Sequence, residues 1–340
     1  MRPAPAALSL LGALASVATA QVYTLADAYI GGAFFETWEW QTIADPTHGD
    51  VNYVDLGTAI SQNLTYATFD TFVMRADSTN VVNGTTGRSS NRILSNRAYT
   101  ESVAILDLQH MPQGCATWPA FWSLSQTGPW PDGGEIDIIE GVNLQTGNLM
   151  SLHTSANCTM PSTARTMSGS ATSTICDAAY NSNQGCGVAG VPLSYGADLN
   201  AAGGGWFAMQ RGAATGIRAW FWSREAAGSV PLAVRYPLLA AVTGVAPDDS
   251  WGEPYAAFPM GAACNYTEHF NAHQFVFDLT FCGDWAGSAY PSSGCPGTCT
   301  DLVNNNPQAF EEAYWEVNGL YIYTPTEDST WGSYPPYPSS

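Results

Sequence analysis

Hydrophobic and polar residues alternate along short stretches of this chain, and clusters of Gly, Pro, Asn and Ser separate these stretches. Alternation with a period of two is typical of β-strands that have one buried face. The pattern predicts strands at residues 71–77, 101–110, 216–223, 274–282 and 314–323, the last with a break at Asn318-Gly319.

Helical patterns are scarce by comparison. Only residues 307–315 predict a short helix or turn. Residues 158–205 are rich in Ser, Thr, Asn and Gly, and we expect long loops there, held by Cys158, Cys176 and Cys186. Many strands with turn residues between them predict an all-β fold, a sandwich or a barrel.

The two ends of the chain have patterns of their own. Residues 1–20 combine Arg2, a short apolar stretch and the small residues Ala18-Thr19-Ala20, which together predict a secretory signal peptide. No later stretch reaches the roughly 20 apolar residues of a transmembrane helix. We therefore expect a secreted, extracellular protein with a single domain at 21–323 and no membrane association. A Pro/Ser/Tyr-rich tail at 324–340 lacks a packing pattern and is expected to be a disordered end.

The net charge of the chain limits the classes of molecule that it is expected to bind. The formal net charge is -19, and the 10 basic residues are all arginine. Such a surface repels nucleic acid and anionic membranes, whereas a neutral polymer such as a polysaccharide is compatible with it. An acidic surface that only keeps a secreted protein soluble explains the charge equally well, so charge excludes partners without identifying one.

The cysteines and sequons agree with export. Eight cysteines behind a predicted signal peptide indicate four disulfides, whose pairing the sequence leaves open. A zinc site is the competing interpretation, because His269 with His273 and Cys295 with Cys299 are spaced like ligands, although in the reverse order to a zinc finger. Asn-x-Ser/Thr sequons begin at Asn63, Asn83, Asn157 and Asn265.

Three acids lie close together in the run Gly134-Glu-Ile-Asp-Ile-Ile-Glu-Gly141. On a regular strand Glu135 and Asp137 share a face, and Glu140 points the other way. A β-bulge at Ile138 or Ile139 returns Glu140 to the shared face and leaves at least one isoleucine in the core. Three like charges on one face repel each other. A strand with a purely structural role is therefore not expected to carry them unpaired.

Two carboxylates on one face suit glycosidic bond cleavage. Retaining glycosidases need their carboxyl groups ~5–5.5 Å apart, which a curved strand allows and a straight one does not. One group attacks the anomeric carbon while the other donates a proton to the leaving oxygen. The alternatives are a calcium site and a solvated acidic face. The flanking isoleucines oppose full solvation, and calcium usually needs a turn with backbone carbonyls.

Aromatic residues surround this run. Trp118, Trp122 and Trp130 precede it, and indole rings stack on the C–H faces of sugars as well as filling cores. Trp130 lies in Gly/Pro-rich loop sequence, which favours a binding role, whereas core packing is the usual role of the other two. His153 is expected on the adjacent strand, where it either packs or bonds to substrate or a carboxylate.

In these residues the sequence resembles glycoside hydrolase family 16, in particular the secreted fungal laminarinases. The resemblance covers nearly all of the chain after residue 20. It rests on Gly134-Glu-Ile-Asp-Ile-Ile-Glu-Gly-Val-Asn143, with further matches at residues 45–55, 110–115, 152–154 and 279–285. The loop at 123–129 and the stretch 231–247 look longer than in the family, which affects the expected subsite preference and not the reaction class.

The resemblance implies a β-jelly roll sandwich of two curved antiparallel sheets with a concave glucan-binding cleft. It implies an endo-acting, retaining hydrolase of β-1,3- and mixed-linkage β-1,3/1,4-glucans that needs no cofactor. We also expect a monomer. Glu135 would be the nucleophile, Asp137 its assistant and Glu140 the acid/base. Residues resembling those that line the cleft are Arg92, Trp122, Trp130, His153 and Trp285, with Asn52 and Trp118 as weaker candidates.

Two other functions remain open at this stage. A glucan-binding module of the same fold would lose the catalytic acids, which this sequence keeps. A transglycosylase would pass the glycosyl intermediate to another sugar, and lengthened products would reveal it.

Overall fold

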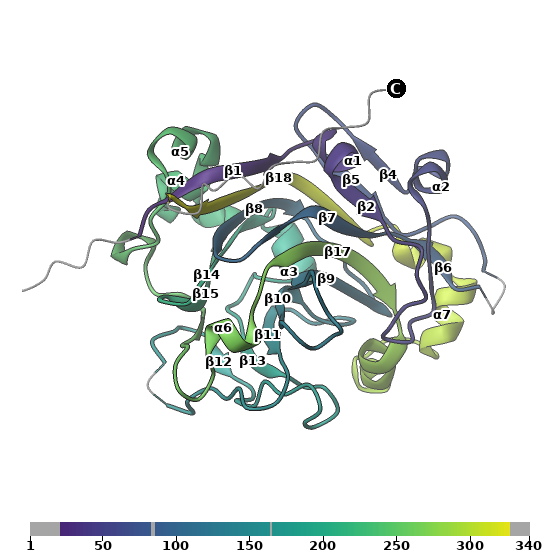
Figure 1. Ribbon diagram of the computed structural model, residues 1–340. Coiled ribbons are helices and arrows are strands. Elements are labelled where there is room, and N and C mark those ends of the chain that lie inside the picture. Colours follow the sequence, from purple (N-terminus) through teal and green to yellow (C-terminus); the bar gives the residue numbers. More distant parts are fainter. Residues whose placement is uncertain (1–20, 83–85, 164, 327–340) are drawn as a thin grey trace, which may run out of the picture.

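Two antiparallel eight-stranded sheets form the body of the molecule (Figure 1). The computed structural model describes residues 21–82, 86–163 and 165–326. The expected signal peptide, the sequon at Asn83 and most of the predicted tail lie outside these residues.

Sheet A contains, in order, β16 (Ala256–Phe258), β15 (Gly216–Ser223), β14 (Gly205–Gly212), β8 (Ser102–His110), β18 (Tyr314–Pro325), β5 (Phe72–Arg75) and β4 (Thr65–Ala67), and β1 (Tyr23–Tyr29) also pairs with β18. Sheet B contains β12 (Ser170–Ala171), β13 (Cys186–Ala189), β11 (Leu149–His153), β10 (Glu135–Glu140), β9 (Thr117–Ser125), β17 (His273–Phe281), β7 (Arg92–Tyr99) and β2 (Trp38–Trp40). A separate parallel pair joins β3 (Val51–Tyr53) to β6 (Arg88–Ser90).

Short helical segments connect the strands. The α-helices are α1 (Ala33–Thr37), α2 (Leu56–Ser61), α3 (Gly196–Ala201), α4 (Leu232–Arg235), α5 (Pro237–Thr243), α6 (Tyr266–His269) and α7 (Cys299–Asn305). Short segments of other helix types are η1 (Arg224–Ser229), η2 (Asp249–Trp251), η3 (Gly283–Gly287), η4 (Tyr290–Ser292) and η5 (Pro307–Phe310). In the described part of the chain, no helix has the length and apolar character needed to cross a bilayer.

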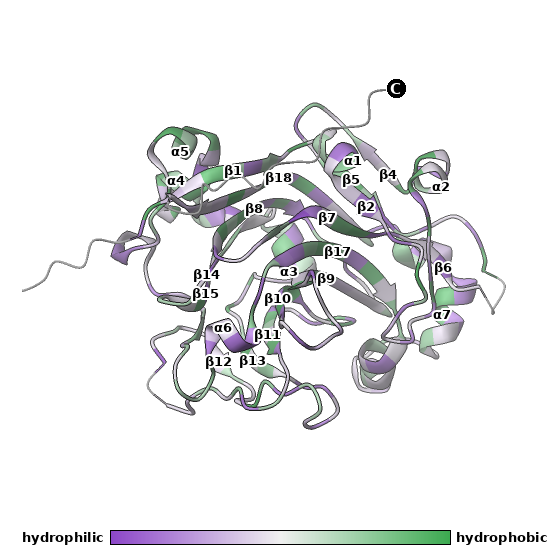
Figure 2. Cartoon of the chain, in the orientation of Figure 1, coloured by the Kyte–Doolittle hydropathy of each residue, from purple (hydrophilic) through white to green (hydrophobic). Residues whose placement is uncertain are grey.

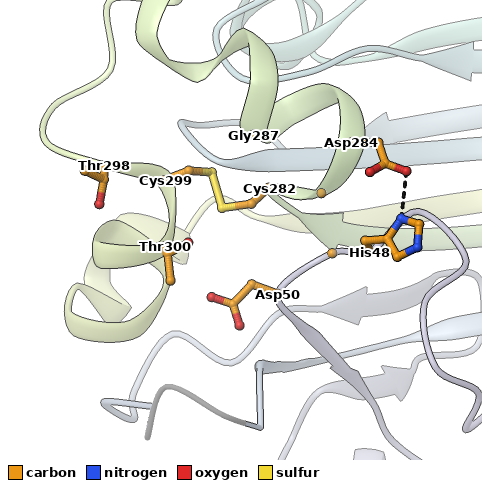
Figure 3. Close-up of a pocket in the computed structure, with 10 residues that line it drawn as sticks. His48, Asp50, Cys282, Asp284, Gly287, Thr298, Cys299 and Thr300 are labelled. Carbon is orange, nitrogen blue, oxygen red and sulfur yellow. Dashed lines mark hydrogen bonds and ion pairs between the residues drawn. A yellow bond between two sulfur atoms is a disulfide. The ribbon is translucent and has the colours of Figure 1, made fainter. Parts of the chain in front are cut away.

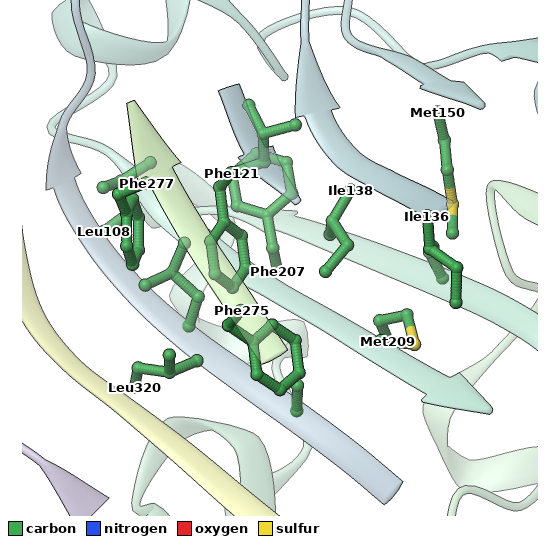
Figure 4. Packing of buried hydrophobic residues seen from close by; sticks show 14 of the residues in the cluster. Leu108, Phe121, Ile136, Ile138, Met150, Phe207, Met209, Phe275, Phe277 and Leu320 are labelled. Carbon is green, nitrogen blue, oxygen red and sulfur yellow. The ribbon is translucent and has the colours of Figure 1, made fainter. Parts of the chain in front are cut away.

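The main core lies between the two sheets (Figure 4). Phe275 and Phe277 of β17 stack near Phe121 of β9, and Leu108 and Phe207 of sheet A belong to the same buried cluster. Hydrophobic residues recur along the strands of both sheets, as Figure 2 shows. The hydrophobic positions of the alternating pattern are therefore those that face the core between the sheets. The predicted all-β sandwich is confirmed.

A second core covers the outer face of sheet A. Trp206, Trp220 and Tyr321 project from the strands and pack with Val234 of α4 and Ala240 of α5. The stretch 231–247, expected to be longer than in the family, forms this cover. Both faces of β15 are consequently buried, which explains its tryptophans at alternate positions.

The predicted strands all form, with small differences at their ends. β15 matches its prediction at both ends, and β18 contains irregular pairing between Glu316 and Gly319, at the predicted break. The predicted start of the tail at Thr324 is wrong, because β18 continues to Pro325 and pairs Thr324 with Thr24 of β1. Local composition missed this, since the pairing partner is about three hundred residues away in sequence.

Residues 158–205 are more structured than the sequence indicated. The prediction of loops alone is wrong for β12, β13 and α3, which lie within this region. The two strands are short and extend the end of sheet B, with β13 paired to β11 and β12 at the edge, so their sequence carries little alternation.

All eight cysteines form disulfides, as predicted. The pairs are Cys115–Cys295, Cys158–Cys264, Cys176–Cys186 and Cys282–Cys299. The zinc alternative is wrong, because Cys295 and Cys299 each bond to a different distant cysteine.

Candidate active site

The three acids share one face of sheet B because β10 contains a bulge. Opposite β9, Glu135 pairs with Leu124, Asp137 with Trp122 and Glu140 with Ala120. These partners are two residues apart, so they lie on one face, and so do the acids. Ile138 is the extra residue, since Asp137 and Ile139 face consecutive positions of β9.

Both isoleucines of the bulge are buried in the core, and Asn148 holds the distortion in place. Its side chain accepts a hydrogen bond from the Glu140 backbone N–H at 2.9 Å and donates one to the Ile138 carbonyl at 2.7 Å. The Tyr255 hydroxyl also donates to the Ile138 carbonyl, at 3.2 Å. The bulge was predicted, whereas Asn148 and Tyr255 were missed because nothing local in the sequence connects them to it.

An indole N–H donates to each of the two glutamates. Trp130 Nε1 lies 3.0 Å from Glu135 Oε2, and Trp118 Nε1 lies 2.9 Å from Glu140 Oε1. Trp130 is about half exposed, at 47%. Its ring is thus available to a ligand, and Trp118, a weaker candidate in the sequence, contacts an acid directly.

The Asp137 carboxylate pairs with a histidine on the next strand. His153 sits opposite Glu135 across the β10–β11 ladder, and its Nε2 lies 3.3 Å from Asp137 Oδ2. On the other side of the ring, Nδ1 lies 2.7 Å from the Asn183 side-chain oxygen. Both ring nitrogens therefore have acceptors, an arrangement that suits a protonated imidazole. Asn183 was not found from the sequence.

Burial and the charges of neighbouring side chains shift the pKa values of Glu135, Glu140 and His153. Burial, and then the negative charge of Asp137, raises the pKa of Glu135 to about 8 and that of Glu140 well above its usual value. Burial alone would lower the pKa of His153, but its hydrogen bond to Asp137 and the surrounding carboxylates raise it to about 10. The cluster therefore retains protons at neutral pH.

A second polar group lies on the same face beside Trp122. Arg92 of β7 donates to Asp278 of β17 at 2.9 Å, and the Trp122 Nε1 donates to the same carboxylate at 3.1 Å. The Arg92 guanidinium also lies 4.9 Å from the centre of the Trp122 ring. Asp278 was missed as a site residue, although a charged position in an otherwise apolar strand is a usable signal.

Trp285 is brought to the site from a distant segment. Its ring in η3 meets Trp118 edge to face, with centroids 5.6 Å apart. The Asn143 side chain fixes this segment by donating to the Ala286 carbonyl at 2.9 Å. Asn52 lies exposed in β3.

One group of side chains in the described residues has the spacing of metal ligands. Oxygen atoms of Glu135 and Asp137 and a nitrogen of His153 all lie within 4.8 Å of one another. The raised pKa of His153 opposes metal binding, because a ligating imidazole must be neutral. The arrangement suits proton transfer and nucleophilic attack instead.

Known proteins are similar to this chain in sequence and in fold. A family model described as "XgeA-like, catalytic GH16 domain" matches residues 38–323. The structure of laminarinase 16A from Phanerochaete chrysosporium, with β-glucans in both donor and acceptor sites, is 49% identical with a TM-score of 0.83, covering 89% of this chain and 100% of that one. An elongating family 16 β-1,3-glucosyltransferase is 39% identical with a TM-score of 0.79, over 89% of this chain and 100% of that one.

Curated fungal proteins have comparable sequence identity to this chain. A probable glycosidase of Schizosaccharomyces pombe is 42% identical over 309 residues, which cover 89% of this chain and 70% of that protein. A probable endo-1,3(4)-β-glucanase of Aspergillus niger is also 42% identical, over 92% of this chain but only 41% of that protein. The chain thus spans less than half the length of this second relative.

A two-sheet sandwich with a bulged strand that carries three acids, together with these relatives, defines a β-sandwich glycosidase. The chain belongs to glycoside hydrolase family 16.

Proposed function

We propose that this protein is an endo-acting, retaining glucanase that cleaves β-1,3- and mixed-linkage β-1,3/1,4-glucans. The observation that carries the proposal is the bulge at Ile138, which puts Glu135, Asp137 and Glu140 on one outer face of sheet B. The names of the laminarinase and endo-1,3(4)-β-glucanase relatives support laminarin and lichenan as substrates.

The mechanism is a double displacement. A Glu135 oxygen attacks the anomeric carbon, and the bond to the leaving oxygen breaks as Glu140 donates its proton to that oxygen. Water then attacks the same carbon, Glu140 takes up the proton, and the bond between sugar and Glu135 breaks. Two inversions at one carbon leave the product with the original configuration.

The surroundings act on the two glutamates in different ways. Glu140 must be protonated at the start, and its raised pKa favours this state. Glu135 must be ionised to attack; burial and the charge of Asp137 raise its pKa to about 8, and the positive charge of His153, the Trp130 N–H and the charge of Arg92 oppose that rise and stabilise the ionised form. Asp137 holds His153 in place and keeps it charged.

Secretion and a monomeric state belong to the same proposal. The pattern at residues 1–20 supports export, and the four disulfides suit an oxidising compartment.

Transglycosylation is the second candidate activity. It is favoured by the elongating β-1,3-glucosyltransferase among the similar structures, since the same glycosyl intermediate serves both reactions. Longer oligosaccharides among the products would identify it.

Product release from laminarin, lichenan and carboxymethylcellulose tests the proposal. We expect hydrolysis of the first two only, with β-anomers appearing first by NMR. Glu135→Gln and Glu140→Gln should each lower kcat/KM by roughly a thousandfold or more, as removal of a nucleophile does in other covalent enzymes. Glu253→Gln is the matched control, because this glutamate is exposed next to η2. Near-normal activity of Glu135→Gln, or α-anomers as first products, would contradict the mechanism.

A further inference from the structure

A loop closed by a disulfide, residues 177–185, lies against the histidine of the active site. His153 is the last residue of β11, and its two chain neighbours pair with the two ends of the loop. These pairs are Thr154 with Asp177 and Leu152 with Cys186. The Cys176–Cys186 disulfide joins the two ends of the loop to each other. The loop therefore starts and finishes beside His153.

Two residues of this loop contact the imidazole ring of His153. The Asn183 side-chain oxygen lies 2.7 Å from Nδ1 and accepts a hydrogen bond from it. The backbone of Gly185 packs so close to the ring that a Cβ atom there would lie 2.8 Å from Cε1 and 2.9 Å from Nε2, which only glycine avoids. Because Nε2 lies 3.3 Å from Asp137 Oδ2, the ring is held between the loop and β10.

The backbone that presents Asn183 is left-handed. Asn181, Ser182 and Asn183 have φ angles of 46°, 56° and 62°, in a region that L-residues other than Asn and Asp seldom adopt. This backbone alone accounts for an asparagine at both 181 and 183. The two side chains differ in their contacts, however, because Asn181 donates to the Gln184 side chain and Asn183 bonds to His153.

The charge of His153 acts on the nucleophile. Three carboxylates of β10 surround the ring, those of Asp137, Glu135 and Glu140. Strand β13 carries no charged residue, and the one charged residue of the loop is Asp177, whose carboxylate accepts from the Ala179 backbone N–H at 2.9 Å. The positive charge of His153 opposes the rise in the pKa of Glu135. A group that holds the proton at Nδ1 therefore favours the ionised nucleophile.

We propose that Asn183 is a positioning residue of the reaction, which orients the His153 ring through the Nδ1 hydrogen bond so that its positive charge faces Asp137 and Glu135. The loop at 177–185 serves to carry this side chain. The inference rests on the proposed function, because it takes Glu135 to be the nucleophile.

Three variants separate the side chain of Asn183 from its backbone. Asn183→Gly removes the side chain and keeps the left-handed conformation, which glycine adopts without steric cost. Asn181→Gly makes the same change two residues away and is the matched control. Asn183→Asp keeps an oxygen that can accept from Nδ1. We would measure kcat and KM on laminarin across pH, with thermal unfolding to confirm that each variant is folded.

Proton NMR of the imidazole rings tests the contact without substrate. The chain has 5 histidines, so their ring signals can be followed individually. His48 is an internal reference, because it lies exposed at the surface with its Nδ1 2.9 Å from Asp284 (Figure 3). The Nδ1–H signal of His153, identified by its loss in His153→Gln, should be present in the wild type, Asn181→Gly and Asn183→Asp. It should disappear by exchange with water in Asn183→Gly.

We expect Asn183→Gly to lower kcat about tenfold with little change in KM, the loss of one hydrogen bond to a charged group. The acidic limb of its kcat/KM profile should also move to higher pH, whereas Asn181→Gly and Asn183→Asp should resemble the wild type. Equal kcat in the two glycine variants, or an intact Nδ1–H signal in Asn183→Gly, would overturn the role of Asn183 and leave the proposed function standing. A wild type that releases nothing from laminarin would overturn both.

Discussion

At the residue scale, two tryptophan N–H groups oppose the larger effects of burial and of Asp137 on the pKa values of the two glutamates. Each donates to one glutamate only, Trp130 to Glu135 and Trp118 to Glu140. A hydrogen bond to a carboxylate stabilises its ionised form and lowers its pKa. The two glutamates can therefore be perturbed separately without changing their own side chains.

Replacing each indole by a phenyl ring keeps an aromatic ring and removes the N–H. We expect Trp130→Phe to raise the pKa of Glu135 and move the acidic limb of the kcat/KM profile to higher pH. Trp118→Phe should raise the pKa of Glu140 and move the alkaline limb to higher pH instead. A pH–rate series on laminarin distinguishes the limbs, and a shift of the same limb by both variants would contradict the assigned roles.

The raised pKa of Glu135 also predicts how stability varies with pH. Its pKa rises from 4.5 in the unfolded chain to about 8 in the folded protein, so the folded state binds more protons between these values. The stability that the folded protein gains by binding this proton more tightly is fully present below pH 4.5 and is lost as the pH rises toward 8. Glu135→Gln should therefore raise the melting temperature relative to wild type by a few degrees at pH 8 and little at pH 4, measured by calorimetry. An equal effect at both pH values would show that burial does not penalise the carboxylate.

At the scale of the element, the bulge in β10 creates the candidate active site, because it places all three acids on one face of the strand. Without the extra residue, Glu140 would point into the core, where an unpaired carboxylate is costly. The sequence predicts the bulge from its spacing of acids and isoleucines, but the side chains that hold it come from other segments.

Asn148 is the residue on which the bulge depends most. Asn148→Ala leaves the buried Glu140 N–H without its side-chain acceptor and should cost about 1–3 kcal/mol of unfolding free energy. It should also lower kcat, because Glu140 loses its fixed position. Tyr255→Phe is the matched comparison, since it removes one hydroxyl bond to the Ile138 carbonyl while Asn148 keeps another, and it should cost less. Urea unfolding and kinetics measure both, and equal effects would contradict the role of Asn148.

At the scale of the whole molecule, disulfides tie together the segments around the active site. Cys115 and Cys295 are 180 residues apart, whereas Cys176 and Cys186 are separated by 10. A longer closed loop removes more entropy from the unfolded chain, giving roughly 5 kcal/mol for the first bridge and roughly 3 kcal/mol for the second. We expect the double Cys→Ser variant of the first pair to be the less stable by urea unfolding. The reverse order would mean that native-state contacts, and not chain entropy, dominate.

The sequence by itself determined the features that depend on neighbouring residues. Period-two alternation gave the strands, because a strand with one buried face must repeat every two residues. The spacing of Glu135, Asp137 and Glu140 gave the acids and their bulge for the same reason. Trp130 could be recognised as a loop residue from its flanking glycines and prolines.

Only the tertiary structure decided which distant residues meet. The pairing of Arg92 with Asp278, the contact of Trp118 with Trp285 and the cysteine pairs join residues that are between 10 and 186 positions apart. Such contacts follow from how two sheets and their loops pack, and packing leaves no period in the sequence.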